Sequence, residues 1–303
     1  MKSIREIIDK AARAEHRTLA VAAAHGEDVL RAVAEARKTG LISAILVGDK
    51  GSITGTLRAL GEDLKDYQVV DAPLEECAAK AVSFITSGDA DFLMKGLIGT
   101  ADMMRAVMDR DNGVRTGSLI SHVMIYEAPG HPRLLALTDG GVNTFPDLEK
   151  KALILENAAA MLRKMGYDEI VAACICGAEV VEPKIQSTLD AAELVSMDER
   201  WKPYNMHVIG PVGLDLAINE DACRHKGYRQ EYGGKADILL VPSYEVGNGI
   251  GKALTYFAGA RSAGIILGAQ VPIVLVSRAD ESQTKLASIA LGCILSSERE
   301  ENR

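Results

Sequence analysis

The sequence VPIVLVSRADES, from Val271 to Ser282, joins an apolar run to an abrupt polar ending. Its β-branched first half predicts a buried strand of a parallel sheet. Ser277, Arg278 and Asp280 follow that strand directly. Because open α/β sheets bind ligands beyond the carboxyl ends of their strands, these residues are candidates for an active site, and the arginine suggests an anionic substrate. The alternative is a turn in which Asp280 or Ser282 caps the next helix and Arg278 is solvated.

Strand-like and helix-like segments alternate along most of the chain, which is typical of a doubly wound α/β protein. Predicted strands include residues 19–24, 43–47, 67–70, 92–95, 118–126, 134–137, 169–174, 206–209 and 237–241. Predicted helices include residues 27–38, 74–86, 100–108 and 283–295. A further helix is predicted to open within residues 144–147, with Pro146 near its first turn, and to run through residue 162. A core of small aliphatic residues, with 48% hydrophobic but only 4% aromatic residues, favours layered helices and parallel strands over a β-sandwich.

A chain of 303 residues exceeds the usual size of a single hydrophobic core, so two lobes are expected. The pattern changes near Gly117, where two longer strands form a hairpin-like start, and the strand–helix alternation of the N-terminal part returns after Gly264. We expect a first domain of residues 1–117 plus 268–303 and a second of residues 118–267. In this arrangement the C-terminal segment rejoins the sheet of the first domain.

The formal charge of -8 argues against general nucleic-acid binding, which depends on basic surface. An anionic ligand would need a local positive pocket, and the candidate cations are Lys95, Arg105, Arg115 and Arg278. No segment has about 18 uninterrupted apolar residues, and no signal core is present, so we expect a cytoplasmic protein without membrane contact. Five cysteines suggest free thiols in a reducing compartment, and Cys174 and Cys176 are expected in the core.

Two glycine-containing motifs are candidate ligand loops. Val246 to Lys252 reads VGNGIGK, follows a strand and opens a helix, so its amides could receive a phosphate; it departs from the dinucleotide and P-loop patterns, and an ordinary tight turn is the alternative. Asp139, Gly140, Gly141 and Asn143 lie between a strand and a strongly capped helix, where a ligand site and a structural loop are equally compatible. No histidine or G-x-S-x-G pattern supports a catalytic triad.

Four ordered motifs together resemble the phosphate acetyltransferase and butyryltransferase family over nearly the whole chain. They are Lys95-Gly96 with Thr100 to Arg105, Thr138 to Asp147, Val241 to Asn248, and Ser277 to Asp280. The resemblance implies two α/β domains, each a three-layer α/β/α structure with a mostly parallel sheet. It also implies a fold like that of isocitrate and isopropylmalate dehydrogenases, an active-site cleft between the domains, and a homodimer or larger homo-oligomer.

The implied reaction is reversible acyl transfer between coenzyme A and inorganic phosphate, with coenzyme A as a co-substrate, no tightly bound cofactor and no metal. Cations would hold phosphate beside the thioester and stabilise the developing negative charge. The resemblance implies that Arg278, Arg105 and Ser277 do so. It places Lys95, Gly96, Thr100, Asp139 and Asn143 on the phosphate side and Glu245, Gly247, Asn248 and Gly249 on the coenzyme A side.

Two departures separate the chain from the acetyltransferase branch and favour butyryl-coenzyme A as the substrate. The position seven residues after Ser277, where that branch has an aspartate as the expected base, is Thr284, so Asp280 becomes the candidate base. The stretch from Asp71 to Ala90 also lacks the arginine of that branch. The alternatives are acetyl transfer, an oxidoreductase of the isocitrate dehydrogenase type, and a non-catalytic coenzyme A-binding protein.

Overall fold

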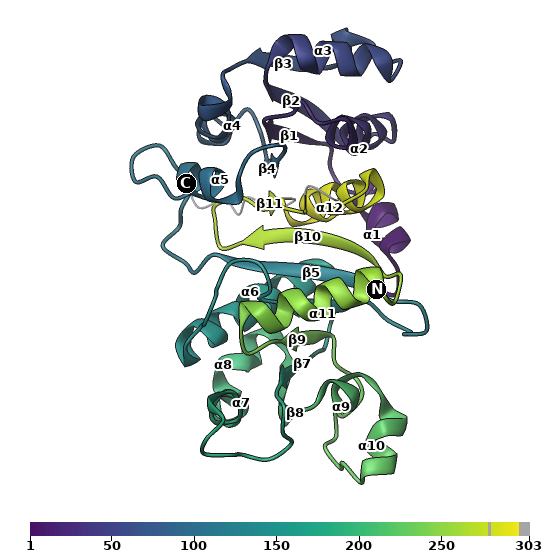
Figure 1. Cartoon of the computed structure of the whole chain (residues 1–303), viewed down its shortest axis with the longest axis vertical. Coiled ribbons are helices and arrows are strands. Elements are labelled where there is room, and N and C mark those ends of the chain that lie inside the picture. The colour runs from purple at the N-terminus through teal and green to yellow at the C-terminus, as the bar shows by residue number, and fades with distance from the viewer. Residues whose placement is uncertain (278–279, 297–303) are drawn as a thin grey trace. The chain divides into compact units, whose positions relative to one another are not determined.

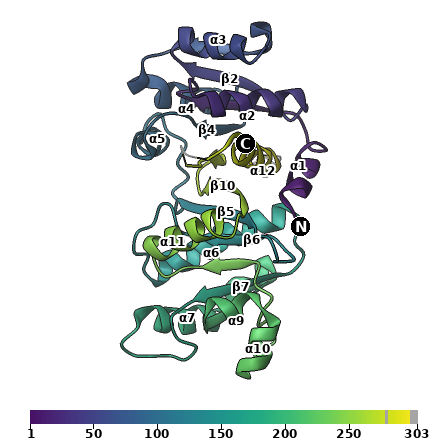
Figure 2. The ribbon, with the colours of Figure 1, turned by 45° about the vertical axis from the view of Figure 1, so that its right-hand side comes forward.

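The computed structural model describes residues 1–277 and 280–296, and these divide into two compact units. The first, called here the N/C unit, contains Ile4–Ser118 and the chain from Ala263 onward. The second, called the middle unit, contains Met1–Ser3 and Leu119–Ser262. Most of the elements of both are labelled in Figure 1, and β6 is labelled in Figure 2.

The N/C unit has a mostly parallel sheet with the strand order β3-β2-β1-β4-β11-β10. Its first five strands are parallel, and β10 pairs antiparallel with β11. The strands are β1 (Arg17–Ala22), β2 (Ile42–Gly48), β3 (Gln68–Asp71), β4 (Phe92–Lys95), β10 (Arg261–Leu267), of which the part from Ala263 belongs to this unit, and β11 (Ile273–Val274). The helices are α1 (Ile4–Ala11), α2 (Glu27–Lys38), α3 (Lys50–Ala59), η1 (Leu64–Asp66), η2 (Leu74–Glu76), α4 (Cys77–Thr86), α5 (Thr100–Val107) and α12 (Ser282–Leu295).

Helices cover the N/C strands on two sides. Figures 1 and 2 show α2 beside α12 on one side of β1 and β4, with α4 and α5 on the other. All four residues of β4 are buried, which explains its unbroken apolar sequence before Lys95. In α2 the buried residues are small or aliphatic, acidic residues occupy the first turn and basic residues the last, as the helix dipole favours.

The C-terminal segment rejoins this sheet, as predicted, because β11 pairs in parallel with β4 through Ile273–Leu93 and Val274–Met94. The strand is nevertheless much shorter than the apolar run suggested. Pro272 has no N–H to donate, so it cannot extend the ladder as a donor, and Leu275 and Val276 are buried without strand pairing.

The middle unit has the strand order β5-β6-β9-β7-β8. β5 and β6 form the predicted antiparallel pair, and the remaining pairs are parallel. Its strands are β5 (Ser121–Glu127), β6 (Leu135–Thr138), β7 (Ile170–Ile175), β8 (Met206–Val212) and β9 (Ile238–Leu240). Its helices are α6 (Leu148–Lys164), α7 (Gln186–Ser196), α8 (Asp198–Trp201), η3 (Lys202–Tyr204), α9 (Leu214–Ile218), α10 (Glu220–Lys226) and α11 (Tyr244–Tyr256).

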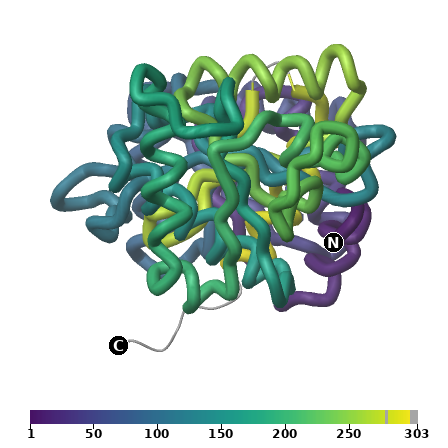
Figure 3. The backbone as a smooth tube through the Cα atoms, turned by 90° about the horizontal axis from the view of Figure 1, so that it is seen from below, coloured from purple at the N-terminus to yellow at the C-terminus, as the bar shows by residue number. Residues whose placement is uncertain are grey.

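The helix predicted to open within residues 144–147 begins at Leu148, where the Asp147 side chain caps it by accepting from Lys150 N at 2.9 Å. Pro146, which was expected near the first turn, precedes the cap. The light-green coil at the top of Figure 3 is α11. The predicted mixed α/β architecture with mostly parallel sheets is therefore confirmed. None of the helices described here has both the length and the apolarity needed to cross a bilayer.

Candidate functional site

A pocket of about 200 Å³ opens in the N/C unit where the direction of chain winding reverses. The chain proceeds outward from β1 through β2 to β3, then returns to place β4 on the other side of β1. Such a reversal separates the loops at the carboxyl ends of neighbouring strands and leaves room for a ligand. We call this the switch-point pocket; its lining comprises Gly26, Glu27, Asp28, Val29, Lys95, Gly96, Leu97, Val276, Ser277 and Lys285.

Two buried lysines line the switch-point pocket. Lys95, at the end of β4, is 5% exposed, and its Nζ donates to the carbonyls of Gly96 at 3.2 Å and Ile98 at 3.3 Å. Lys285, in α12, is 3% exposed, and its Nζ donates to the Asp280 carbonyl. Removing an ammonium from water is costly, and the carbonyl that holds Lys285 Nζ offsets that cost less completely than an anion does. The pocket therefore favours a negatively charged ligand.

The first turn of α2 adds backbone donors to the same pocket. Gly26 is the N-cap, and no side chain among the described residues accepts a capping hydrogen bond from this helix end. The first-turn amides of a helix lack intrahelical partners and carry the positive end of its dipole. Glu27 and Asp28 are exposed, and Glu27 pairs with Arg31 at 2.6 Å. Their charges are screened by solvent more strongly than those of the buried lysines.

Ser277 and Asp280 form a turn after β11. Ser277 N donates to Asp280 Oδ2 at 2.8 Å, and Asp280 N donates to the Ser277 carbonyl at 3.2 Å. Ser277 lines the switch-point pocket together with Lys95 and Gly96. Three of the residues predicted from the sequence thus come together here. Arg278 lies outside the described residues.

Arg105 lines a different pocket. This α4–α5 groove has a volume of about 640 Å³, and both Arg105 and Asp102 border it. The Arg105 side chain is 77% exposed and its Nη1 is 2.9 Å from Asp102 Oδ1. Thr100, exposed at the first position of α5, lines neither this groove nor the switch-point pocket. The groove wall is largely apolar and includes Leu74, Ala78, Val82, Leu97, Ile98 and Ala106.

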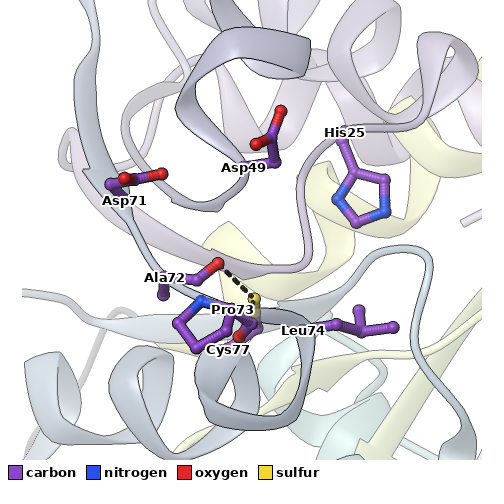
Figure 4. A pocket seen from close by; sticks show the side chains of 7 residues that line it. All are labelled: His25, Asp49, Asp71, Ala72, Pro73, Leu74 and Cys77. Carbon is purple, nitrogen blue, oxygen red and sulfur yellow. Dashed lines mark hydrogen bonds between the residues drawn. The ribbon is translucent and has the colours of Figure 1, made fainter.

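A third pocket, of about 460 Å³, lies beyond the ends of β2 and β3 and is drawn in Figure 4. His25, Asp49 and Asp71 are its polar side chains, and Cys77 Sγ donates to the Ala72 carbonyl. Hydrogen bonds from Ser52 hold the pKa of Asp49 below its usual range. Two carboxylates make this pocket unfavourable for phosphate, in contrast to the switch-point pocket.

In the middle unit, Asp139 organises the loop after β6. Its buried carboxylate accepts from the backbone amides of Gly141 and Val142, both at 2.8 Å, and of His122 at 3.1 Å. Asn143 donates through its backbone N at 3.3 Å and through Nδ2 at 2.6 Å. Nδ2 of Asn143 also donates to the Ile120 carbonyl at 2.9 Å. This geometry favours the structural alternative for Asp139 and Asn143, because their polar atoms hold the loop itself.

The VGNGIGK motif does not form a loop that opens a helix. α11 begins at Tyr244 with Ser243 as N-cap, and Gly247 N already donates to the Ser243 carbonyl at 3.1 Å. The prediction of a phosphate-receiving loop at Gly247 is therefore wrong, since these amides form helix hydrogen bonds. Glu245 and Gly249 are exposed on α11, and Asn248 is half-buried.

Gly247 has a packing role that the motif did not indicate. A Cβ at Gly247 would lie 2.7 Å from Gly140 Cα and 2.8 Å from Val241 Cγ2. The two glycines thus let α11 approach the Asp139 loop backbone to backbone. Around Gly249, by contrast, no atom of the described residues beyond the adjoining chain of α11 lies within 4 Å of the corresponding position.

All five cysteines are free and buried, including Cys174 and Cys176 as predicted. Burial raises the pKa of every one of these thiols above the usual value. The thiols are Cys77, Cys174 in β7, Cys176, Cys223 and Cys293 in α12. These thiols are therefore poor nucleophiles. No group of three His, Cys, Asp or Glu side chains within residues 1–277 and 280–296 is arranged to hold a metal ion.

Sequence reasoning missed Lys285 and the first turn of α2 as site components. A signal for Lys285 was available, because it is the one charged residue in a helix that reads SQTKLASIALGCIL. Charged side chains are rarely fully buried, so a single lysine in an otherwise apolar helix marks a candidate functional residue.

The comparisons with known proteins agree with the motifs. The chain matches the model of the phosphate acetyl/butaryl transferase family over residues 65–293. It is 43% identical over 296 residues to phosphate butyryltransferase of Clostridium acetobutylicum, covering 97% of this chain and 98% of that protein. It is 39% identical over 283 residues to phosphate acetyltransferase of Thermotoga maritima, covering 93% and 96%.

A solved structure is also similar. The crystal structure of a branched-chain phosphotransacylase from Enterococcus faecalis V583 superimposes with a TM-score of 0.81 and 29% sequence identity, covering 92% of this chain and 99% of that one. The family match, the near-complete coverage of curated relatives and the shared fold lead to one conclusion: this chain belongs to the phosphate acetyl/butaryl transferase family.

Proposed function

We propose that this protein transfers an acyl group reversibly from acyl-coenzyme A to inorganic phosphate, giving acyl phosphate and coenzyme A, and that butyryl-coenzyme A is the preferred donor. Relatives named phosphate butyryltransferase, at 43% and 40% identity over nearly the full length, support this preference. A relative named phosphate acetyltransferase at 39% identity makes acetyl transfer the alternative.

One observation carries the proposal. The switch-point pocket combines two buried ammonium groups, an uncapped helix start and the Ser277 side of a strand end. Phosphate must be held beside the thioester carbonyl for its oxygen to attack, and positively charged groups favour both the bound phosphate and the oxyanion that forms. A pocket with this lining suits phosphate far better than the carboxylate-lined pocket of Figure 4.

In the proposed reaction a phosphate oxygen forms a bond to the carbonyl carbon, and the carbon–sulfur bond then breaks to release coenzyme A thiolate. Lys95 and Ser277 support the phosphate, and we retain Arg278 and Arg105 as candidates for oxyanion stabilisation. Asp280 remains the candidate base that takes the thiol proton in the reverse direction. Gly96, Thr100, Glu245, Asn248 and Gly249 remain candidates for substrate contacts.

The apolar wall of the α4–α5 groove suits the acyl chain. Leu97 lines both this groove and the switch-point pocket, so a chain in the groove would start beside the phosphate. Ala106→Leu narrows the groove and should lower kcat/KM for butyryl-coenzyme A relative to acetyl-coenzyme A by about 10-fold or more, in the range that one or two methylenes discriminate. Ala101→Leu, on the exposed side of α5 and outside the groove, is the matched control.

Several finer expectations belong to this proposal. They are a dehydrogenase-like version of the fold, the two domains of residues 1–117 plus 268–303 and 118–267, an active-site cleft, and a homodimer or larger homo-oligomer. Coenzyme A acts as a co-substrate without a tightly bound cofactor. Five free, buried thiols support a cytoplasmic location.

The direct experiment measures free thiol release from acetyl-, propionyl- and butyryl-coenzyme A with and without phosphate. The proposal expects release that requires phosphate and a kcat/KM that is highest for butyryl. Release with a maximum at acetyl would favour the alternative. Stabilisation by coenzyme A without turnover of any thioester would favour a non-catalytic binding protein, and reduction of a nicotinamide cofactor with hydroxy acids would favour an oxidoreductase.

A further inference from the structure

We propose that Lys285 binds the phosphate substrate directly, together with Lys95 and the first-turn amides of α2, and that it sets the affinity of the enzyme for phosphate. This inference rests on the proposed function and deepens it, because it names the residue that selects a tetrahedral dianion. None of the four family motifs contains Lys285.

The surroundings of Lys285 differ from those of a structural buried lysine. Lys151, on α6, is also buried, but its Nζ lies 2.5 Å from Asp190 Oδ2, which neutralises it. Among the residues that the structure describes, no carboxylate lies within ion-pair distance of Lys285 Nζ, which instead donates to the Asp280 carbonyl. A carbonyl carries no net charge, so it does not neutralise an ammonium as a carboxylate does.

The other groups of the pocket act in the same direction. Lys95 places a second ammonium in it, and the uncapped amides from Glu27 to Val29 add fixed donors. Helix starts of this kind bind phosphate in other α/β proteins. Two buried cations and several backbone N–H groups match the acceptor oxygens of a phosphate dianion, whereas a neutral acyl chain gains nothing from them.

Lys285 is suited to its role by position as well as charge. It lies about one helical turn after the Ser277–Asp280 turn and donates to that turn, so it reaches the pocket from α12, whereas Lys95 reaches it from β4. Phosphate bound here would lie beside Ser277. A three-donor ammonium can contact phosphate while keeping one bond to the Asp280 carbonyl.

The test uses Lys285→Met and Lys285→Arg in the full-length protein, with phosphate and butyryl-coenzyme A varied separately. Lys285→Met should raise the KM for phosphate about 10- to 100-fold, the factor for one charge-assisted hydrogen bond. The KM for butyryl-coenzyme A should change much less, and Lys285→Arg should restore most of the phosphate affinity. Lys80→Met, an exposed lysine on α4 that lines none of the three pockets, is the control.

Coenzyme A also carries phosphate groups, which could bind in the same pocket. Separate KM values for inorganic phosphate and for butyryl-coenzyme A distinguish these two ligands. A rise in the KM for butyryl-coenzyme A without a rise in that for phosphate would assign the pocket to coenzyme A and overturn the inference. Equal changes in both KM values together with kcat would also overturn it, because they would indicate that Lys285 only supports the Ser277–Asp280 turn.

A binding measurement keeps the inference independent of turnover. Inorganic phosphate alone, without thioester, should raise the Tm of the wild-type protein and of Lys80→Met, and at the same phosphate concentration should raise the Tm of Lys285→Met much less. If no acyl-coenzyme A is turned over, the proposed function fails, but phosphate stabilisation that depends on Lys285 would still support the site. Phosphate stabilisation of Lys285→Met equal to that of the wild type would contradict it.

Discussion

Ser277 and Asp280 bond to each other in both directions: the Ser277 amide donates to Asp280 Oδ2 at 2.8 Å, and the Asp280 amide donates to the Ser277 carbonyl at 3.2 Å. The carboxylate of Asp280 therefore shapes the turn that presents Ser277 to the switch-point pocket. This structural task is separate from proton transfer. Asparagine can perform the first, because its amide oxygen accepts a hydrogen bond, but it cannot act as a base.

Asp280→Asn separates the two tasks. If Asp280 is the base for the coenzyme A thiol, kcat in the direction of acyl-coenzyme A synthesis should fall by about 10²–10⁴-fold. Steady-state kinetics and the pH profile of kcat measure this effect. A fall of less than about tenfold, the factor for one neutral hydrogen bond, would show that the carboxylate serves the turn alone.

Gly247→Ala and Gly249→Ala should have opposite effects on stability although both lie in α11. The new methyl group at 247 would meet the Gly140 backbone at 2.7 Å, so we expect a loss of about 1–3 kcal/mol in the free energy of unfolding. The methyl group at 249 would enter open space, and replacing a helical glycine should add about 0.5–1 kcal/mol. Urea unfolding of both variants checks the pair; equal effects would refute the close approach.

Glu62 predicts a pH-dependent contribution to stability. Its side chain is 2% exposed and contacts Lys38 at 2.5 Å, Arg37 at 3.4 Å and the Tyr67 hydroxyl at 2.8 Å. Burial alone would raise the pKa of Glu62, but the hydrogen bonds from Lys38, Tyr67 and Arg37 outweigh it and lower the pKa below its ordinary value of 4.5. The stabilisation is therefore present above pH 4.5 and lost as the pH falls through the lower folded-state value.

Glu62→Gln should accordingly lower the free energy of unfolding by about 1–3 kcal/mol at neutral pH. This loss should become smaller as the pH falls below 4.5, the ordinary pKa of a glutamate carboxyl. Denaturant unfolding over a pH series measures it. Glu15→Gln, which changes an exposed carboxylate paired with Arg17, should have an effect of less than about 1 kcal/mol at every pH. A cost for Glu62→Gln that does not depend on pH would contradict the ion-pair account.

The cysteines should not take part in catalysis. All five are buried, and burial raises the pKa of each thiol, bringing that of Cys293 to about 12. The native protein should therefore react slowly with iodoacetamide at neutral pH and keep its activity, whereas the unfolded protein should react fully. Mass spectrometry and activity assays follow both. Rapid inactivation that butyryl-coenzyme A prevents would argue for a reactive thiol.

Local sequence signals predicted much of the fold. The helix Glu27–Lys38 has the predicted bounds, because Gly26 and Gly40 flank an amphipathic run with complementary end charges. The return of the C-terminal segment to the sheet was also predictable, because strand–helix alternation resumes after the middle unit. The length of β11 could not be predicted in this way, because an apolar run indicates that residues are buried but not that they pair in a sheet. The partner strand and Pro272 decide where the strand pairing ends.

The site was less predictable. Ser277, Lys95 and Gly96 come together because parallel strands end at one edge of the sheet, and that rule works from sequence. Asp139 was a candidate ligand because a carboxylate beside glycines can bind either a ligand or its own loop. Only the folded loop reveals that its oxygens accept local N–H groups. Lys285 was not predicted as a site residue because its contact with the pocket depends on how α12 packs against the sheet.

Phosphorus NMR tests acyl transfer to phosphate most directly, since it observes the product rather than the released thiol. The protein is incubated with butyryl-coenzyme A and inorganic phosphate, and each component is omitted in turn. We predict a new acyl phosphate resonance that grows as inorganic phosphate declines, appears only in the complete mixture, and decreases when coenzyme A is added in excess. Release of coenzyme A with butyrate and unchanged inorganic phosphate would show transfer to water and contradict the account.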